Sequence, residues 1–226
     1  MSLFAIADLH LSFGVNKPMD VFLGWNDYVS KIKKNWLNQV KQNDTVVIAG
    51  DVSWGMDLNQ AFKDFAFLNS LPGQKILLKG NHDYYFSTKT KLDKFFYENG
   101  FNSLNFLYNN SFECGDFSIC GTCGWVNMTD KNDFDEKILK REAGRLNLSL
   151  KSAKKTPLVF LHYPPLFCKN RSLAILNILN TFKVARVFYG HLHGNACKCA
   201  VIGNFEGINY NLISSDYLNF NLLKIF

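Results

Sequence analysis

Short apolar runs alternate with longer segments of helical periodicity through the first hundred residues of the chain. The runs at 3–7, 45–49 and 75–79 predict buried strands, because each is short and rich in aliphatic residues. Between the first two runs, apolar residues recur on one face of a helix: Val29, Ile32, Trp36 and Val40. This alternation predicts an α/β domain in which helices cover a sheet.

Local signals place the remaining elements. Asn26 or Asp27 can cap a first helix, and Asp57 can cap a second that ends at Leu71-Pro72-Gly73. We expect further helices at 89–98 and 172–182, an exposed polar helix at 131–154, strands at 158–161 and 185–189, and short strands over 200–226. The runs 105–113 and 117–122 are expected to pair as a hairpin.

Length and composition indicate one globular domain over 1–226. Of its 226 residues, 47% are hydrophobic and 19% are charged, and no repeat or linker divides the chain. No apolar run reaches the roughly 18 residues that a membrane-spanning helix needs, so no membrane partner is expected. The opening run has no basic region before it and is interrupted by Asp8 and His10, unlike a signal peptide. We therefore expect a cytoplasmic protein.

The formal net charge of +6 comes from lysines scattered along the chain. It is compatible with an anionic substrate and leaves nucleic-acid binding open, although solvated helix faces are the commoner explanation of such lysines.

Six cysteines allow two interpretations. They are Cys114, Cys120, Cys123, Cys168, Cys197 and Cys199. The C-x-x-C and C-x-C spacings among them are compatible with a zinc site, but the two pairs lie far apart in the sequence. We expect reduced, buried thiols instead.

All five histidines of the chain lie at the ends of predicted strands. Together with acidic and amide residues they form five blocks: Asp8-Leu9-His10, Gly50-Asp51, Gly80-Asn81-His82-Asp83, His162 and Gly190-His191-Leu192-His193. The carboxyl ends of strands line the ligand crevice of an α/β sheet, so blocks far apart in sequence can converge there. Side chains two residues apart on an extended chain point to the same side, so the D-x-H pair and the H-x-H pair can each bind one metal ion or two adjacent ions.

The donor set of these blocks favours transition metals. Imidazole nitrogens, carboxylates and an amide oxygen suit Mn, Fe, Zn, Co or Ni, and the absence of thiolates disfavours a structural zinc site. Two carboxylates facing two divalent ions leave a net positive charge, which attracts phosphate.

In this order the five blocks resemble the calcineurin-like metallophosphoesterase superfamily, closest to small bacterial predicted phosphohydrolases of unassigned substrate. The resemblance implies a four-layer α/β/β/α sandwich of two mixed sheets flanked by helices. It also implies two divalent or mixed-valence metal ions. One would be bound by Asp8, His10 and His193, the other by Asn81, His162 and His191, and Asp51 would bridge the two.

The same resemblance implies hydrolysis of a phosphomonoester or phosphodiester by in-line attack of a hydroxide held between the two ions. His82 would protonate the leaving group, and Asp83 would orient its imidazole. The second block continues as Val52-Ser53-Trp54-Gly55 and lacks the arginine of the G-D-x-x-D-R-G protein phosphatases. A small phosphoester is therefore the expected substrate.

Several alternatives stay open. A nuclease with the same metal centre would need a basic groove lined by aromatic residues. A metal-binding scaffold without catalysis is a further alternative, although all ligands and His82 are present. Lys17 can contact phosphate, and the segment 84–155, inserted between the third and fourth blocks, can form a partial cap. Nearby aromatic residues can stack on a substrate or pack in the core: Trp25, Trp54, Tyr84, Tyr85 and Trp125. The pattern does not determine the oligomeric state.

Overall fold

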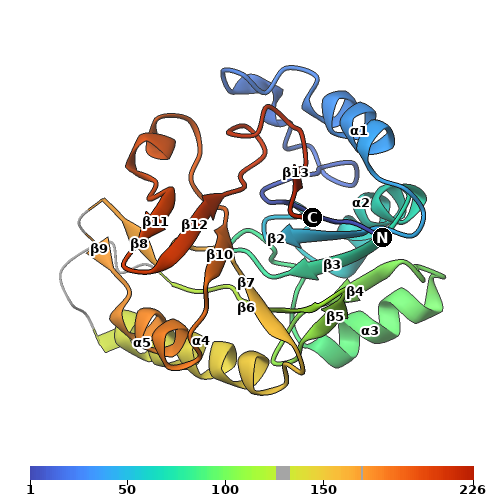
Figure 1. The fold of residues 1–226 in the computed structure, drawn as a ribbon. Coiled ribbons are helices and arrows are strands. Elements are labelled where there is room, and N and C mark those ends of the chain that lie inside the picture. Colours follow the sequence, from blue (N-terminus) through green and yellow to red (C-terminus); the bar gives the residue numbers. More distant parts are fainter. Residues whose placement is uncertain (126–132, 169) are drawn as a thin grey trace.

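The computed structural model describes residues 1–125, 133–168 and 170–226, and these fold into four layers (Figure 1). Two β-sheets pack face to face in the middle. The helices α1, α2 and α3 cover the outer face of one sheet, on the right of Figure 1, and α4 and α5 cover the other. The predicted α/β/β/α sandwich is confirmed.

The first sheet has the strand order β13-β1-β2-β3-β4, with all neighbours parallel except β13, which is antiparallel to β1. Its strands are β1 (Leu3–Ile6), β2 (Thr45–Ala49), β3 (Gln74–Leu78), β4 (Leu104–Phe106) and β13 (Leu223–Lys224). Its helices are α1 (Tyr28–Gln39), α2 (Leu58–Ser70) and α3 (Lys89–Glu98), with a short 3-10 helix η1 (Met19–Val21) before α1.

The second sheet has the order β11-β12-β10-β7-β6-β5, with a parallel centre and an antiparallel strand at each edge. Its strands are β5 (Phe112–Cys114), β6 (Phe117–Thr122), β7 (Thr156–Leu161), β10 (Arg186–Tyr189), β11 (Gly203–Phe205) and β12 (Ile208–Leu212). The remaining elements are α4 (Asp133–Lys151), α5 (Leu173–Thr181), the 3-10 helix η2 (Gly194–Cys199) and the small ribbon β8 (Leu166–Phe167) with β9 (Asn170–Arg171).

Alternation along the strands divides the core into three parts. In β1, Leu3 and Ala5 face the second sheet, whereas Phe4 and Ile6 face the helices. Both sets are buried, so the strand is apolar throughout, as expected for parallel strands covered on both faces. Burial on both faces explains why these strands appear in the sequence as short continuous apolar runs.

The start of one helix follows its predicted capping residue, and the start of another departs from it. Asp57 accepts a hydrogen bond from the Gln60 amide (2.9 Å) at the start of α2, as predicted. Asp27 precedes α1 but has a positive φ of 54° and makes no side-chain cap, so the predicted cap is wrong there. The Asp27 amide instead donates to Asp20 (2.8 Å).

The predicted strand 105–113 is wrong as a single element. Its first part belongs to β4 at the edge of the first sheet, and its last part belongs to β5 at the edge of the second. The segment 84–155 therefore supplies strands to both sheets. Its proposed role as a partial cap stays a prediction.

The polar segment 131–154 forms α4, although residues 131–132 lie outside the described residues. The prediction of an exposed helix is only half right. Leu146 and Leu150 are buried against the outer face of the second sheet, together with Ala143. Ser149 donates a hydrogen bond to the Asn110 carbonyl (2.6 Å), which ties this helix to the loop before β5.

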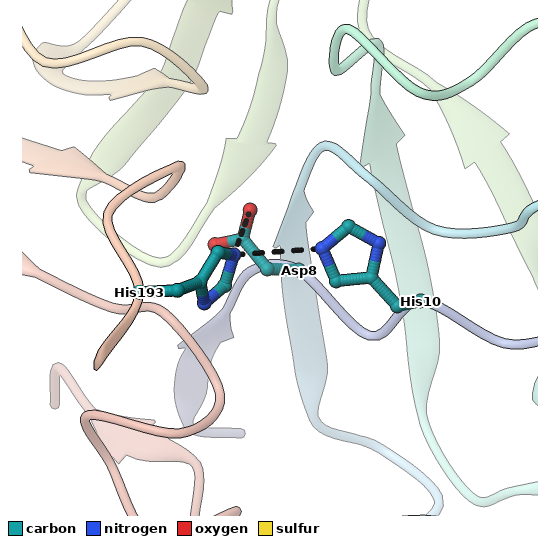
Figure 2. Close-up of side chains that lie close together, drawn as sticks. All are labelled: Asp8, His10 and His193. Carbon is teal, nitrogen blue, oxygen red and sulfur yellow. Dashed lines mark hydrogen bonds and ion pairs between the residues drawn. The ribbon is translucent and has the colours of Figure 1, made fainter. Parts of the chain in front are cut away.

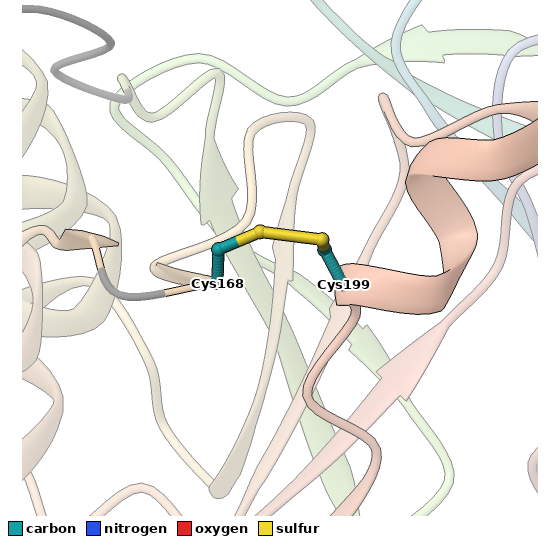
Figure 3. The surroundings of a disulfide bond; sticks show 2 residues. All are labelled: Cys168 and Cys199. Carbon is teal, nitrogen blue, oxygen red and sulfur yellow. A yellow bond between two sulfur atoms is a disulfide. The ribbon is translucent and has the colours of Figure 1, made fainter.

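A disulfide joins Cys168 to Cys199 (Figure 3). The expectation that all cysteines are reduced thiols is wrong for this pair, because the β8–β9 ribbon packs against η2 and brings together two residues 31 positions apart. Cys114 and Cys120 are free and buried, as expected. Disulfides are uncommon in reducing compartments, and the cytoplasmic location stays a prediction. Among the described residues, none of the helices has both the length and the hydrophobicity to cross a bilayer.

Candidate metal centre

The carboxyl ends of strands from both sheets meet at one place. Backbone hydrogen bonds connect them there: between the sheets the Ala7 amide donates to the Ile213 carbonyl (2.8 Å), and within the second sheet the Gly190 amide donates to the His162 carbonyl (3.1 Å). The predicted metal ligands follow β1, β2, β3, β7 and β10: Asp8, His10, Asp51, Asn81, His162, His191 and His193. Contacts among their side chains connect all seven.

Asp8, His10 and His193 form the first group (Figure 2). His193 Nε2 lies 3.4 Å from Asp8 Oδ1 and 3.4 Å from His10 Nε2. Figure 2 shows ring nitrogens of His193 and His10 facing each other, with the Asp8 carboxylate close to the His193 ring. Three donor atoms from two sheets therefore face one small volume.

His162 is the centre of the second group. Its Nδ1 lies 3.1 Å from the Ala49 carbonyl, so this nitrogen carries the proton and Nε2 is the free ligand atom. Nε2 lies 2.7 Å from Asn81 Oδ1 and 3.6 Å from Asp51 Oδ1. The His191 ring lies beside it, with centroids 5.1 Å apart.

Asp51 stands between the two groups. Its Oδ2 is 3.7 Å from His10 Nε2, whereas its Oδ1 is 3.6 Å from His162 Nε2. Asp8 also approaches His162, at 3.7 Å, but through the Nδ1 that faces Ala49. Asp51 is therefore the carboxylate that can reach free donor atoms on both sides.

The backbone of the site is strained in four places. Asp8, His10, Asp51 and His191 all have φ between 47° and 71°, a left-handed region that non-glycine residues seldom occupy. Such conformations gather at functional sites, where the surrounding structure fixes them. Here they turn each side chain from the strand end into the shared volume.

Two glycines allow the close approach of these loops. A Cβ on Gly80 would overlap the Asp51 carboxylate, and a Cβ on Gly190 would overlap the Asp8 carboxylate. Any side chain at these positions would displace a ligand. This is the physical reason for the glycine in the third and fifth blocks.

Burial sets the charge state of the donors. It lowers the pKa of His10 to about 3 and that of His191 to about 3, so both imidazoles are neutral and free to bind metal. Burial, and then the Asp8 charge, raise the pKa of Asp51. Burial opposes ionisation of Asp8 as well, but His193, His162 and His10 hold its pKa below the usual value.

This donor set fits a pair of transition-metal ions. Two buried carboxylates close to each other are costly without a cation, which the raised pKa of Asp51 reflects. Neutral imidazoles with a free Nε2, carboxylate oxygens and one amide oxygen are ligands of such ions. No cysteine belongs to the candidate metal groups of the described residues.

The predicted role of Asp83 is wrong. Its buried carboxylate accepts hydrogen bonds from the amides of Gly80 (2.7 Å), Val52 (2.8 Å) and Ser53 (3.2 Å). It therefore connects the loops after β2 and β3 and does not orient the His82 imidazole. The His82 Nδ1 instead lies 3.4 Å from the Tyr84 hydroxyl.

Sequence reasoning missed Asp216. Its Oδ1 accepts a hydrogen bond from His193 Nδ1 (2.8 Å), and its Oδ2 accepts one from the Gly194 amide (2.8 Å). Asp216 follows the end of β12 by four residues, so the strand-end rule that found the other residues was also a signal for this one. Together with Asp8 it raises the pKa of His193 to about 10, against the effect of burial.

The calcineurin-like phosphoesterase family model matches residues 1–195, a range that includes all seven predicted metal ligands. The chain belongs to this family. It is a metal-dependent phosphohydrolase, as predicted. No curated protein matches the sequence.

Two solved structures have a fold similar to that of this chain. AQ665, a protein of unknown function from Aquifex aeolicus, is 17% identical, with a TM-score of 0.56 over 99% of this chain and 95% of its own. The phosphopantetheinyl hydrolase PptH from Mycobacterium tuberculosis is 12% identical, with a TM-score of 0.59 over 100% and 95%. At these identities the likeness concerns the fold.

Proposed function

We propose that the chain hydrolyses a small phosphoester at a dinuclear metal centre. The observation that carries the proposal is the convergence of seven ligand-type side chains from five strand ends, with the Nε2 atoms of His10, His162 and His193 turned inward. A structural role for so many buried polar groups is a poor alternative, because it would leave two carboxylates without a cation.

In this proposal Asp8, His10 and His193 hold one ion, while Asn81, His162 and His191 hold the other. Asp51 is shared, which its position between His10 and His162 supports. When bound, two such ions supply Lewis acidity and a nucleophile at neutral pH for in-line attack on phosphorus. The ions that suit this donor set are those of Mn, Fe, Zn, Co and Ni.

His82 is the proposed proton donor to the leaving alcohol. Its amide donates to Asp51 Oδ1 (2.8 Å), so its backbone is fixed to the shared ligand. Its ring lies against Trp54, with centroids 4.4 Å apart, and its Nδ1 faces Tyr84. The Nε2 is then the atom that holds the transferable proton. Burial lowers the pKa of His82, and the negative charge of a substrate phosphate would raise it again.

A small substrate is favoured over a nucleic acid. The cavity that His10, His82 and His193 line has a volume of about 540 Å³, the size of a small-molecule pocket. Its other walls carry apolar side chains, without the row of cations that tracks a nucleic-acid backbone. A nuclease remains the second candidate because Lys17 lies beside Trp54. A silent scaffold is disfavoured because every ligand and His82 are present.

The proposal is tested by a substrate panel on protein reconstituted with each metal. The panel contains p-nitrophenyl phosphate, bis-p-nitrophenyl phosphate, cyclic nucleotides, nucleotide sugars and single-stranded nucleic acid. We expect metal-dependent turnover of at least one small phosphoester. Turnover of nucleic acid alone, reduced strongly by salt, would favour the nuclease, and no turnover with any metal would overturn the proposal.

A further inference from the structure

The metal centre opens into a cavity whose outer wall is apolar. The cavity of about 540 Å³ is lined by three site histidines and by large apolar side chains of the segment before α1 and the loop after β2. These apolar side chains are Met19, Phe22, Leu23, Trp25 and Trp54. An apolar wall directly beside a charged catalytic centre requires a reason.

Packing in the hydrophobic core explains only part of this apolar wall. Trp25 and Met19 are buried in the core behind the first sheet, but Phe22 is 55% exposed and Leu23 is 102% exposed. Their neighbour Val21 is 74% exposed. Three consecutive large apolar residues left in water beside a cavity usually mark a binding surface.

We propose that this cavity binds an apolar group on the leaving alcohol, so that the substrate is an amphiphilic phosphoester. The inference rests on the proposed function and specifies its substrate class. His82 supports the placement, because the proposed proton donor lines this same cavity. The group that receives its proton, and whatever that group carries, must therefore lie there.

Charge supports the same orientation. The Lys17 ammonium lies over the Trp54 ring, 5.0 Å from its centroid, and Trp54 stacks on His10 at 5.0 Å. A positive charge thus stands where the apolar wall meets the metal ligands. This arrangement suits a substrate that is anionic at one end and apolar at the other.

The cavity on the Asn81 side of the centre is different. It measures about 330 Å³. Its lining mixes charged with aromatic side chains: Lys79, Arg141, Glu142, Arg145, Phe86, Tyr108, Trp125 and Tyr163. Its charged groups can accommodate a polar or anionic substituent, for which the apolar cavity offers few partners.

A nucleobase is a weaker candidate for the apolar cavity. Base-specific recognition uses hydrogen-bonding partners for the base edge, and apart from the site histidines the lining offers only the Asn195 amide and the indole N–H groups of Trp25 and Trp54. The Gly194 amide in the lining already donates to Asp216. Alkyl and simple aryl groups need no such partners.

Chain-length series test the inference. We would measure kcat/KM for methyl, butyl and hexyl phosphate and for the corresponding methyl alkyl phosphodiesters, because the pKa of the leaving alcohol hardly changes along each series. Calorimetry with methyl-, butyl- and hexylphosphonate gives a binding readout that needs no turnover. Each buried methylene should raise affinity and kcat/KM by up to about fourfold. We expect at least a tenfold rise from methyl to butyl.

The variants Phe22→Ala and Leu23→Ala should flatten this dependence on chain length. Leu37→Ala is the matched control, because Leu37 is 54% exposed on α1 and does not line the cavity. It should keep the full dependence. Circular dichroism would check that all three variants fold.

The outcomes separate the two proposals. Tighter binding of longer phosphonates without any hydrolysis would overturn the proposed function, and with it the leaving alcohol, and would leave only an apolar binding site beside the metal ligands. Hydrolysis with no dependence on chain length would overturn this inference alone. If the Phe22 and Leu23 variants keep the chain-length dependence but lose sedimentation with phosphatidylglycerol vesicles, the exposed residues contact a membrane and the inference is wrong.

Discussion

Asp216 Oδ1 lies 2.8 Å from Nδ1 of His193, and this contact fixes which nitrogen of His193 faces Asp8 and His10. A carboxylate that accepts from one nitrogen of a metal-binding histidine sets its tautomer and makes the other nitrogen a better ligand. Asp216→Ala should therefore weaken metal binding about 10- to 100-fold, as measured by competition with a fluorescent chelator.

Asp216→Asn should recover part of this affinity, because its amide oxygen can still accept from Nδ1. Asp116→Ala is the control, since Asp116 is exposed in the turn between β5 and β6. Equal metal affinity in wild type and Asp216→Ala would show that Asp216 does not position His193.

Substitutions of Asp51 and of His82 should have different effects on metal content and turnover. Asp51→Asn should lower the metal content of the purified protein, because Asp51 faces both ligand groups. His82→Ala should keep the metals and lower kcat about 10²- to 10⁴-fold for alkyl leaving groups, with a much smaller loss for p-nitrophenol, which needs little protonation. Metal analysis and kinetics on the same preparations check both expectations. Equal losses for both leaving groups would contradict the role of His82.

Lys75 should make stability depend on pH. It is fully buried in β3, its ammonium donates to the carbonyls of Leu71 (2.5 Å) and Gly73 (2.8 Å), and burial lowers its pKa to about 8. The unfolded value is near 10.5, so the unfolded chain binds more protons between pH 8 and 10.5 and the free energy of unfolding rises with pH there. Between pH 7 and 9 this contribution should be about 1 kcal/mol.

Urea denaturation of wild type and Lys75→Met at pH 7, 8 and 9 measures this contribution. The difference between the two proteins isolates Lys75 from cysteines that titrate in the same range. A difference that does not change with pH would show that Lys75 has an ordinary pKa.

The Cys168–Cys199 disulfide should stabilise the oxidised protein. It closes a loop across a sequence separation of 31, for which loss of unfolded-chain entropy corresponds to about 3 to 4 kcal/mol. Cys168→Ser should therefore unfold at a lower urea concentration than oxidised wild type. In dithiothreitol the two proteins should unfold alike. Identical unfolding under oxidising conditions would mean that the pair does not form a stabilising bond.

The sequence predicted those helices and strands whose pattern is contained in one short segment of the chain. β2 and α3 have the limits that were predicted. A strand buried on both faces gives a continuous apolar run, and a helix with one buried face gives apolar residues at helical spacing, so both can be identified from neighbouring residues alone. The division of 105–113 between two sheets was not predictable in this way. Both parts look like strands, and only tertiary packing decides which sheet each part joins.

The site shows the same limit at the level of single residues. The blocks identified ligands by residue type and by their place at strand ends, and the structure brings those seven side chains together. Asp83 was misjudged because adjacency to His82 in sequence says nothing of where its carboxylate points. Asp216 was missed because it belongs to no block; it meets His193 because β10 and β12 are neighbours in the second sheet, a pairing that the sequence does not record.

The central claim is that two metal ions held by these strand ends carry out phosphoester hydrolysis. The most direct measurement is a titration of metal-free protein with Mn²⁺, in which bound metal per chain and hydrolysis of bis-p-nitrophenyl phosphate and p-nitrophenyl phosphate are followed together. We predict two bound ions per chain, with turnover that rises as the second site fills and is lost in Asp51→Asn. Binding of no metal, or turnover that is the same before and after metal is added, would contradict the account.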